Sequence, residues 1–394
     1  MILDSKKVVM AELSDIRYDA RVLKQASTLS RSGYDVSLIM YNSDIQQIEE
    51  GKSNGMTTIS IPFQKRHYSK TRLQRALRWF IFLIVVSNYF RKIIAMKADY
   101  YHAHNFYVGW IVLLSSIVHG GKFIYDIHEI IWDEPGLVYK AGLAVDKLLL
   151  PHASLVICPS EDRVKLISDY YKLKKPPLAL FNYPRRQSSV LSSTDNFFKK
   201  ELSLSNGSIL LCYTGMFSVK TRLQDNVIKA LPHIPEKAVF VIIGFGHPNE
   251  ITILEETAKK CNVRERVFIL APKSHAVLMQ YTQCCDIGIS LIKNLGIGYR
   301  YHALNKFYEY VSSGLAVLAS NFPTFNHDIY ENPVGRIGST CNEEDPFSIA
   351  ESIGELIADE SRLAALKNNS VQVSRNYWNW EMQEGKLLQA YERL

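Results

Sequence analysis

The sequence predicts an α/β fold with two doubly wound parallel sheets, one in each half of the chain. Short apolar runs typical of buried strands alternate with segments of helical apolar spacing, first over residues 8–171 and again over residues 209–358. Between the two sets, residues 184–208 are rich in Ser, Asn and Lys and lack periodicity, which indicates a linker or a long surface loop. A chain of 394 residues is also too long for one ordinary core and suits two domains.

The first half contains five predicted strands that alternate with helices. The strands are expected at residues 8–13, 36–40, 100–103, 123–125 and 155–158, and the helices at 19–32, 106–118, 139–150 and 160–171. Gly33 is placed to end the first helix, because glycine readily adopts the backbone conformation found after a helix. We expect one Rossmann-like domain over residues 1–190, joined by the C-terminal tail 372–394.

The second half repeats this pattern. Strands are expected at residues 209–213, 239–243, 267–270 and 287–291, and helices at 222–231, 250–261, 274–283 and 346–358. A short helix with Lys306 and Glu309 then leads through Gly314 into an apolar strand that ends at Ser320. The prediction is a second Rossmann-like domain over residues 205–371, with the two domains facing a central cleft.

Lys306 and Glu309 place a cation and a carboxylate at the mouth of one helix. Such a position suits a ligand that offers phosphates together with hydroxyl groups, because helix amides and a cation bind phosphate. Lys220 and Arg222 are further candidate cations, and residues 296–298 (Gly-Ile-Gly) are expected to form a loop of backbone amides. Gly244 and Gly246 form a weak dinucleotide signal, since the rest of that motif is missing, and a tight turn explains them better.

His128 is the candidate functional residue of the first half. It follows the predicted strand 123–125, and ligands of open α/β sheets bind at the carboxyl ends of strands. Asp126 and Glu129 lie beside it in the sequence, and such carboxylates change the pKa of a histidine. The alternative is a histidine whose hydrogen bonds are satisfied by the local backbone.

The six cysteines are scattered through apolar segments, with no Cys-x-x-Cys pair. This pattern predicts a reduced cytoplasmic chain with neither disulfides nor a zinc site. The start of the chain, residues 1–7, leads directly into a strand pattern, so no signal peptide is expected.

The basic residues are concentrated in the first half of the chain. Residues 1–190 contain 26 Lys or Arg and 17 Asp or Glu, whereas residues 191–394 contain 20 and 22. Residues 51–98 contain ten basic side chains and no acid, and they include the apolar run 79–86. That run is too short to span a bilayer, but a basic, aromatic-rich helix can lie in an anionic membrane interface. Segment 65–97 is therefore either a membrane-surface helix or a core helix with solvated ends; nucleic acid binding is not expected.

Four segments carry a resemblance to a known family. They are Tyr18–Ala26 with Gly33–Val36, then Tyr125–Glu129, then Tyr213–Gly215 followed by Lys220 and Arg222, and finally Lys306–Ser320. In this order they resemble the retaining, nucleotide-sugar-dependent glycosyltransferases of family 4, which have the two-domain GT-B fold. The resemblance covers nearly the whole chain.

The resemblance implies roles for particular residues. His128, Lys220, Arg222 and Glu309 are the implied catalytic set: the cations hold the leaving diphosphate, Glu309 binds the ribose hydroxyls, and His128 contacts the donor sugar. The implied donor-binding residues are Gly215, Gly244, Gly298, Tyr301, Asn305, Lys306 and Glu309. Many relatives have a second glutamate eight residues before the first, where this chain has Tyr301, so one sugar contact of the family is changed.

The implied reaction transfers a sugar from UDP or GDP to a saccharide or lipid-linked saccharide, as in surface polysaccharide synthesis. Attack is expected on the face that the diphosphate leaves, with the leaving group helping to take the acceptor proton. No cofactor and no metal are expected, since the Asp-x-Asp pair of the other glycosyltransferase fold is absent. The alternative functions are a sugar-nucleotide epimerase of similar fold and a non-catalytic protein that binds a sugar nucleotide or a membrane. The expected partners are the donor, the acceptor and an anionic inner membrane surface.

Overall fold

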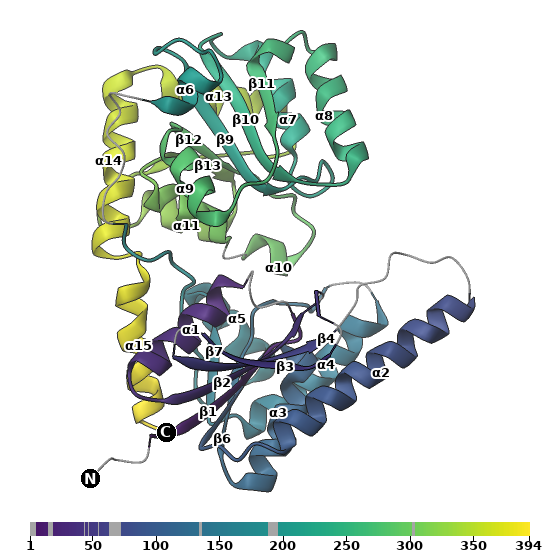
Figure 1. The fold of residues 1–394 in the computed structure, drawn as a ribbon. Helices are drawn as coiled ribbons and strands as arrows, with labels where there is room; N and C mark the ends of the chain where they lie inside the picture. Colours follow the sequence, from purple (N-terminus) through teal and green to yellow (C-terminus); the bar gives the residue numbers. More distant parts are fainter. Residues whose placement is uncertain are drawn as a thin grey trace. The chain divides into compact units, whose positions relative to one another are not determined.

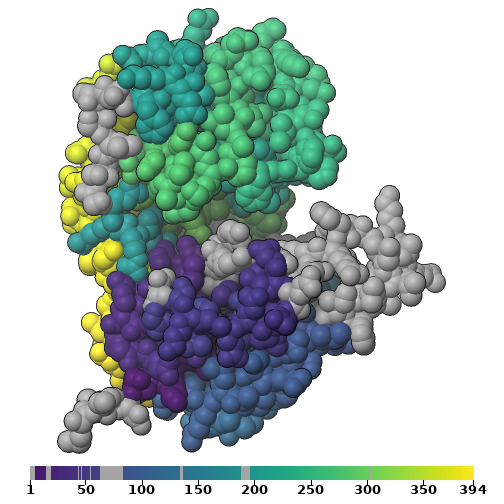
Figure 2. Space-filling view, in the orientation of Figure 1, coloured from purple at the N-terminus to yellow at the C-terminus, as the bar shows by residue number. Residues whose placement is uncertain are grey.

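The structure is a computed structural model, and it describes most of the chain. The described residues are 5–14, 19–42, 44–45, 47–53, 55–62, 72–133, 136–187, 196–301 and 304–394, and the side chains of 72–82 are not described. The remaining residues are grey in Figure 2. The chain divides into two compact units, Met1–Asn182 with Gln383–Leu394 and Tyr183–Met382 (Figure 1). Each unit is an α/β layer structure of the Rossmann type, which confirms the predicted fold class.

Unit 1 contains eight strands in one sheet. The strands are β1 (Lys7–Ala11), β2 (Asp35–Asn42), β3 (Glu49–Ser53), β4 (Met56–Pro62), β5 (Tyr100–His104), β6 (Lys122–Asp126), β7 (Leu155–Cys158) and β8 (Leu178–Ala179). Their order is β3-β4-β2-β1-β5-β6-β7-β8, and all neighbours are parallel except β3 and β4. The antiparallel pair was not predicted. Its strand β3 is exposed throughout and carries no apolar pattern, so periodicity could not reveal it.

The helices of unit 1 lie on both faces of this sheet. They are α1 (Ala20–Arg31), α2 (Arg72–Ile94), α3 (Phe106–His119), α4 (Leu137–Leu149), the short η2 (Leu150–His152), α5 (Glu161–Tyr171) and most of α15 (Trp380–Glu392). Helices α2, α3 and α4 pack side by side against one core, to which alternate residues of β1, such as Val9 and Ala11, contribute. The Tyr391 ring of α15 packs against Tyr34 and Tyr100.

Segment 65–97 was predicted to be either a membrane-surface helix or a core helix with solvated ends. Helix α2 has features of both. Val85, Tyr89 and Ile93 are buried in the core of unit 1, whereas Leu83 and Ile84 are exposed. One face of this helix is therefore a core face, and the other remains open. Residues 65–71 lie outside the described residues. Among the helices that are described, none is both long enough and apolar enough to span a bilayer.

Unit 2 has a six-stranded, fully parallel sheet in the order β11-β10-β9-β12-β13-β14. The strands are β9 (Ile209–Met216), β10 (Ala238–Phe245), β11 (Val267–Leu270), β12 (Ile287–Ser290), β13 (Ala316–Ser320) and β14 (Gly338–Cys341). The α-helices are α6 (Phe197–Glu201), α7 (Gln224–Ala230), α8 (Pro248–Lys260), α9 (His275–Gln283), α10 (Ile297–Arg300), α11 (Asn305–Ser312), α12 (Pro323–Tyr330), α13 (Pro346–Ile357) and α14 (Glu360–Asn376), with 3-10 turns η3 (Leu231–His233) and η4 (Arg264–Arg266).

Two local predictions in unit 2 were wrong. Residues 296–298, expected to form a loop, are instead the N-cap Gly296, at φ 142°, and the first two residues of α10. The expected linker 184–208 contains α6, whose N-terminus is capped by the Asn196 side chain accepting from the Lys199 amide. Both helices are shorter than two turns, so their sequences are too short for a helical period to be visible.

Candidate functional site

The candidate site of unit 2 lies at the carboxyl end of β9. The strand order reverses between β9 and β12, and open α/β sheets bind ligands at the carboxyl ends of strands beside such a reversal. Gly215 lies at this end with φ 108°, a conformation that side chains of L-residues rarely adopt. A Cβ atom at Gly244, on the paired strand β10, would lie 1.9 Å from the Gly215 carbonyl oxygen. The two glycines therefore allow two strand ends to approach closely.

Helix α11 brings Lys306 to this strand end. Tyr310, one turn further along α11, accepts hydrogen bonds from the Thr214 amide at 2.9 Å and from its hydroxyl at 3.2 Å. The Tyr310 ring needs Gly288 beneath it, because an added Cβ there would lie 2.3 Å away. Since positions i and i+4 share a helix face, Lys306 points the same way. Its Nζ lies 3.7 Å from the centroid of the Tyr213 ring and 3.7 Å from a Cβ built on Gly215.

Arg222 adds a second cation beside Lys306. Burial and then the charge of Arg222 lower the pKa of Lys306 well below its ordinary value, and Glu309 opposes this shift. The Nη1 atom of Arg222 is buried and has no hydrogen-bond partner among the described residues. A buried guanidinium nitrogen without a partner, next to a second cation, forms a site that an anion would stabilise.

Glu309 lies one turn after Lys306 and contacts a residue that the sequence did not single out. Its Oε1 atom is 3.2 Å from Nε2 of His275, the first residue of α9. The Glu309 side chain is one-quarter exposed and that of His275 is 70% exposed, so a ligand can reach both. His275 is separated from Glu309 by 34 positions and carries no motif, so only the tertiary structure joins them.

The other predicted donor-binding residues are less closely gathered. Lys220 is exposed in the loop before α7, and no contact between it and Lys306 or Glu309 is described. Gly298 is buried within α10, and Tyr301 follows that helix, its amide donating to the Ile297 carbonyl. Asn305 is exposed at the first position of α11. Their roles toward a donor remain predictions.

In unit 1, Asp126 forms the centre of a buried polar network at the end of β6. Arg21 donates to both carboxylate oxygens, from Nε at 2.9 Å and from Nη2 at 2.8 Å, and Gln25 Nε2 donates at 2.7 Å. Arg21 and Gln25 lie one turn apart on the buried face of α1, whose N-terminus is capped by the Asp19 carboxylate. Burial would raise the pKa of Asp126, but the charges of Arg21 and His128 outweigh it and hold that pKa well below its usual range.

His128 lies against this network, at the carboxyl end of β6 as predicted. Its Nε2 atom is 3.4 Å from Asp126 Oδ2 and 3.1 Å from Nδ1 of His104, the last residue of β5. Burial would lower the pKa of His128, but the Asp126 carboxylate outweighs that effect and raises it. The ring is 14% exposed, so it can still meet a ligand.

Asn105, which follows the neighbouring strand β5 and caps α3, holds the backbone of His128. Its side-chain Oδ1 accepts from the His128 amide at 3.2 Å. Asn105 itself has φ 65° and ψ 166°, a combination that is almost restricted to glycine and costs on the order of 1–3 kcal/mol. Such strain gathers at functional sites, and this residue lies where the strand order of unit 1 reverses between β1 and β5.

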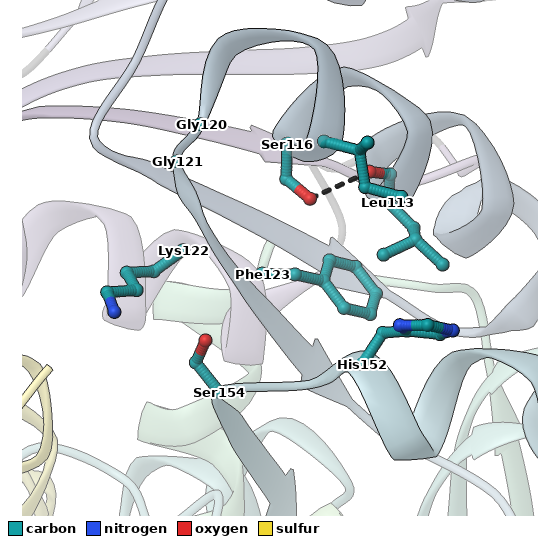
Figure 3. Close-up of a pocket in the computed structure, with 9 residues that line it drawn as sticks. Leu113, Ser116, Gly120, Gly121, Lys122, Phe123, His152 and Ser154 are labelled. Carbon is teal, nitrogen blue, oxygen red and sulfur yellow. Dashed lines mark hydrogen bonds between the residues drawn. The ribbon is translucent and has the colours of Figure 1, made fainter.

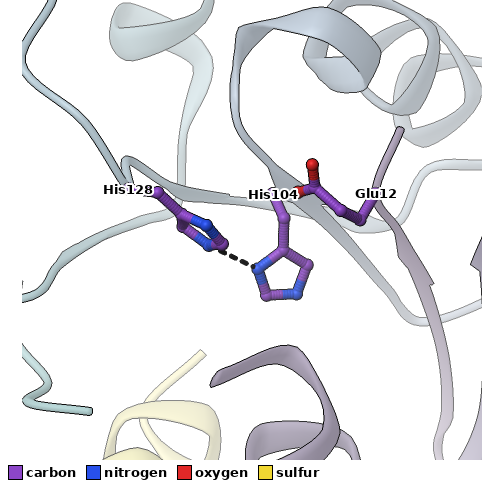
Figure 4. A group of neighbouring side chains, drawn as sticks. All are labelled: Glu12, His104 and His128. Atoms are coloured by element: carbon purple, nitrogen blue, oxygen red, sulfur yellow. Dashed lines mark hydrogen bonds between the residues drawn. The ribbon is translucent and has the colours of Figure 1, made fainter. Parts of the chain in front are cut away.

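Glu12 completes the cluster, directly after β1 (Figure 4). Glu12, His104 and His128 offer three possible metal-ligand atoms within 4.8 Å of one another, and so do His102, His104 and Asp126. These residue types are able to bind a transition metal. The Arg21 cation on Asp126, however, opposes a divalent cation at the same place.

Glu12 makes the stability of unit 1 depend on pH. Burial raises the pKa of Glu12 from 4.5 to about 8, although the charge of His128 opposes the shift. Between these two values the unfolded chain loses this proton and the folded chain keeps it, so stability falls as pH rises from about 5 to 8. Glu12→Gln is expected to remove most of that fall, on the order of 4 kcal/mol between pH 5 and pH 8 in urea unfolding. The exposed Glu49→Gln is the control, and an unchanged pH slope in Glu12→Gln would contradict the assignment.

A separate cavity of about 340 Å³ lies in unit 1 at the other end of β6, its amino end (Figure 3). It is lined by residues at the end of α3 and the start of β6, including Ile117, Gly121 and Lys122, and by His152 and Ser154. None of the predicted site residues lines it. Since His128 follows the carboxyl end of β6, this cavity at the amino end belongs to another surface.

Two family models match the chain. A "Glycosyl transferase 4-like domain" matches residues 18–183, and "Glycosyl transferases group 1" matches residues 194–373. A curated relative, the D-inositol 3-phosphate glycosyltransferase of Xylanimonas cellulosilytica, is 25% identical over 195 residues, which are 49% of this chain and 44% of the relative. The match therefore spans less than half of the length of that relative.

Solved structures share the fold over almost the whole chain. Sucrose-phosphate synthase from Thermosynechococcus elongatus has a TM-score of 0.74 at 16% identity, covering 98% of both chains. HepE from Anabaena, in complex with UDP and glucose, has a TM-score of 0.73 at 12% identity, covering 99% of this chain and 100% of that one. At these identities the likeness shows the architecture.

Proposed function

Because the chain belongs to the group 1 glycosyltransferases of the GT-B fold, with an N-terminal domain of the glycosyl transferase 4 type, we propose that it transfers a sugar from UDP or GDP to a saccharide or lipid-linked saccharide. The observation that carries the donor part is the pair Lys306 and Arg222 at the end of β9. Their charges would hold the diphosphate before transfer and stabilise the charge that grows on it as the sugar leaves.

Each unit, taken by itself, supplies further proposed contacts to the donor. Glu309 would accept hydrogen bonds from the ribose hydroxyls, with His275 beside it. His128 would contact the donor sugar, oriented through Asp126 and Asn105. Tyr301 stands where many relatives have glutamate, so we expect its phenol to donate or accept one hydrogen bond where a charged acceptor is usual.

We propose retention of configuration, with the acceptor attacking on the face that the diphosphate leaves. A double displacement would need a carboxylate nucleophile at the sugar. In unit 1, the Asp126 carboxylate beside His128 already accepts hydrogen bonds from Arg21 and Gln25, so it is not free to act as that nucleophile. The departing diphosphate would then take the acceptor proton, as the family resemblance implies.

The test is a donor screen with product analysis. UDP- and GDP-sugars are screened by thermal shift, because a ligand that binds only the folded protein raises its stability; UDP-glucose comes first, since HepE has been solved with it. The best donors are then incubated with and without saccharide and lipid-linked acceptors. Transfer that requires an acceptor supports the proposal, acceptor-independent turnover supports an epimerase, and binding without turnover supports a non-catalytic protein. NMR of the product's anomeric centre tests retention.

Metal independence gives a further prediction. If Lys306 and Arg222 neutralise the diphosphate, transfer should persist after dialysis against EDTA, with a rate within about twofold of the untreated enzyme. Loss of transfer that returns with Mg²⁺ or Mn²⁺ would show that a metal ion carries this charge instead. Donor binding by thermal shift, measured in parallel, separates loss of binding from loss of chemistry.

We also propose that the enzyme works in the cytoplasm, at the inner face of the membrane. Its six cysteines are unpaired in the structure, as a reducing compartment would keep them. The ten basic residues of 51–98 would attract anionic lipids.

A further inference from the structure

Helix α3 exposes a stripe of large apolar side chains on the outside of unit 1. Tyr107, Trp110, Leu114, Ile117 and Val118 are 39–63% exposed. Their spacing of three and four residues places them on one face, while Val108, Ile111 and Val112 on the other face are buried in the core. The 14 residues of α3 contain no Asp, Glu, Lys or Arg. A helix with a water-facing side normally carries charges there, so this side is built for an apolar contact.

The neighbouring helices extend this stripe. Helix α4 packs against α3 and exposes Leu137, Val138 and Leu148. Helix α2 packs against the other side of α3 and exposes Leu83 and Ile84. In Figure 1 the three helices lie together on one side of the sheet, away from α1 and α15. We call this exposed surface of α2, α3 and α4 the outer helix face. His104 and Asp126 lie on the opposite side of the sheet, toward α1, so this face is distinct from the candidate site.

The charges at the outer helix face have one sign. Helices α2, α3 and α4 contain seven Lys or Arg and a single acid, Asp146. Asp146 is buried, and its carboxylate accepts hydrogen bonds from the Tyr125 and Tyr171 hydroxyls. Lys140 and Lys147 are exposed beside the apolar residues of α4, and Arg91 is exposed on α2, where Lys92 pairs with Glu50 of β3. The apolar stripe is thus bordered by cations with no exposed acid on the same helices.

This combination selects the occupant. A second copy of the chain docking through the same face would bring like charges together, which is unfavourable. An anionic bilayer instead offers apolar acyl chains to the stripe, phosphates to the cations, and an interface in which Trp and Tyr are favoured. We propose that the outer helix face docks on an anionic lipid bilayer, with α3 as its apolar centre. The inference rests on the proposed function, for which it supplies a way to meet a lipid-linked acceptor.

The proposal differs from one based on the basic segment 65–97 alone. That segment ends before α3 and α4, whereas the exposed apolar residues lie mainly on those two helices. Substitutions on α3 and α4 should therefore weaken binding even though segment 65–97 is unchanged.

The test is sedimentation of the full chain with vesicles of phosphatidylcholine, with and without phosphatidylglycerol. We expect binding to the mixed vesicles only. Leu114→Asp with Ile117→Asp should weaken it more than about tenfold, and Lys140→Glu with Lys147→Glu by about tenfold or more. The matched control is Ile253→Asp, at a 41% exposed isoleucine of α8 in unit 2, which should bind as the unchanged protein does. The α4 variant changes only Lys140 and Lys147, which are lysines at the surface. It therefore tests the proposal even if the α3 variant folds poorly.

Donor-induced thermal shift is measured on every variant. An unchanged shift with lost sedimentation supports the proposal and leaves the donor site intact. A chain that binds no donor but still sediments counts against the proposed function, while the bilayer-docking surface itself stays supported. Equal vesicle binding by the unchanged protein and both double variants would overturn the proposal. So would an unchanged protein that binds no vesicles but forms a dimer, if Leu114→Asp with Ile117→Asp dissociates that dimer.

Discussion

Lys306→Ala is expected to lower the rate of sugar transfer by about 100-fold to 1,000-fold, the range found when one preorganised group that stabilises developing charge is removed. The Nζ of Lys306 lies over the Tyr213 ring beside Gly215, where the diphosphate would sit, and Arg222 is its neighbour. The measurement is kcat/KM for transfer from the donor found in the screen. Because Lys306 has a lowered pKa in the free protein, diphosphate binding should also take up a proton at high pH, and this uptake should vanish in Lys306→Ala.

The controls separate a specific cation from general charge. Lys260→Ala removes an equally charged side chain from the same unit, at a position 78% exposed, and should leave kcat/KM unchanged. Lys306→Arg keeps the charge but not the compact ammonium, so partial activity is expected. Arg222→Ala should also reduce transfer, since its Nη1 has no partner among the described residues. Full activity of Lys306→Ala would remove Lys306 from the donor site.

Asp126→Asn is expected to destabilise unit 1 by about 3–5 kcal/mol, because it leaves the buried Arg21 cation without its carboxylate. Arg21 and Asp126 are almost inaccessible to solvent, so water cannot replace the lost partner. Urea unfolding monitored by circular dichroism measures the change. Glu344→Gln is the control: it breaks an exposed pair with Lys293 and should change stability by less than about 1 kcal/mol.

Asp126 also makes the stability of unit 1 fall in acid. The pKa of Asp126 is lower in the folded protein than in the unfolded chain, so unfolding takes up a proton in acid. Its stabilising effect is present at neutral pH and is lost as pH falls below about 4, through the folded pKa. Asp126→Asn should therefore show a smaller loss of stability between pH 6 and pH 3. A double variant, Arg21→Gln with Asp126→Asn, should lose less than the sum of the single changes; strict additivity would mean that the two side chains do not interact.

Several residues of the site were recognisable from the sequence because they lie on short-range patterns. Lys306 and Glu309 share one helix, and His128 follows a strand whose apolar run is clear. The hairpin of β3 and β4, by contrast, has one strand without an apolar face, and α10 has only four residues. These elements depend on their neighbours, and local propensity was too weak to reveal them.

The partners of the site residues were hidden for a different reason. Arg21 and Asp126 are 105 positions apart, and His275 and Glu309 are 34 apart. Arg21 lies in the segment Tyr18–Ala26 but received no predicted role, because the sequence does not say that its helix face is buried against β6. Long-range pairing needs the two chain segments to be packed together, which a single sequence does not display.

By itself, the sequence determined that this protein has two doubly wound halves and which residues lie at the ends of their strands, because alternating apolar runs are local and specify strand and helix directly. Only the tertiary structure decided which charges meet and which apolar faces stay exposed. Helix α3 shows the difference: its sequence is apolar all round, as that of a buried helix would be, yet packing on one side of the sheet covers half of it and leaves Trp110 and Ile117 facing outward. Burial depends on what lies opposite, and that is a property of the folded chain.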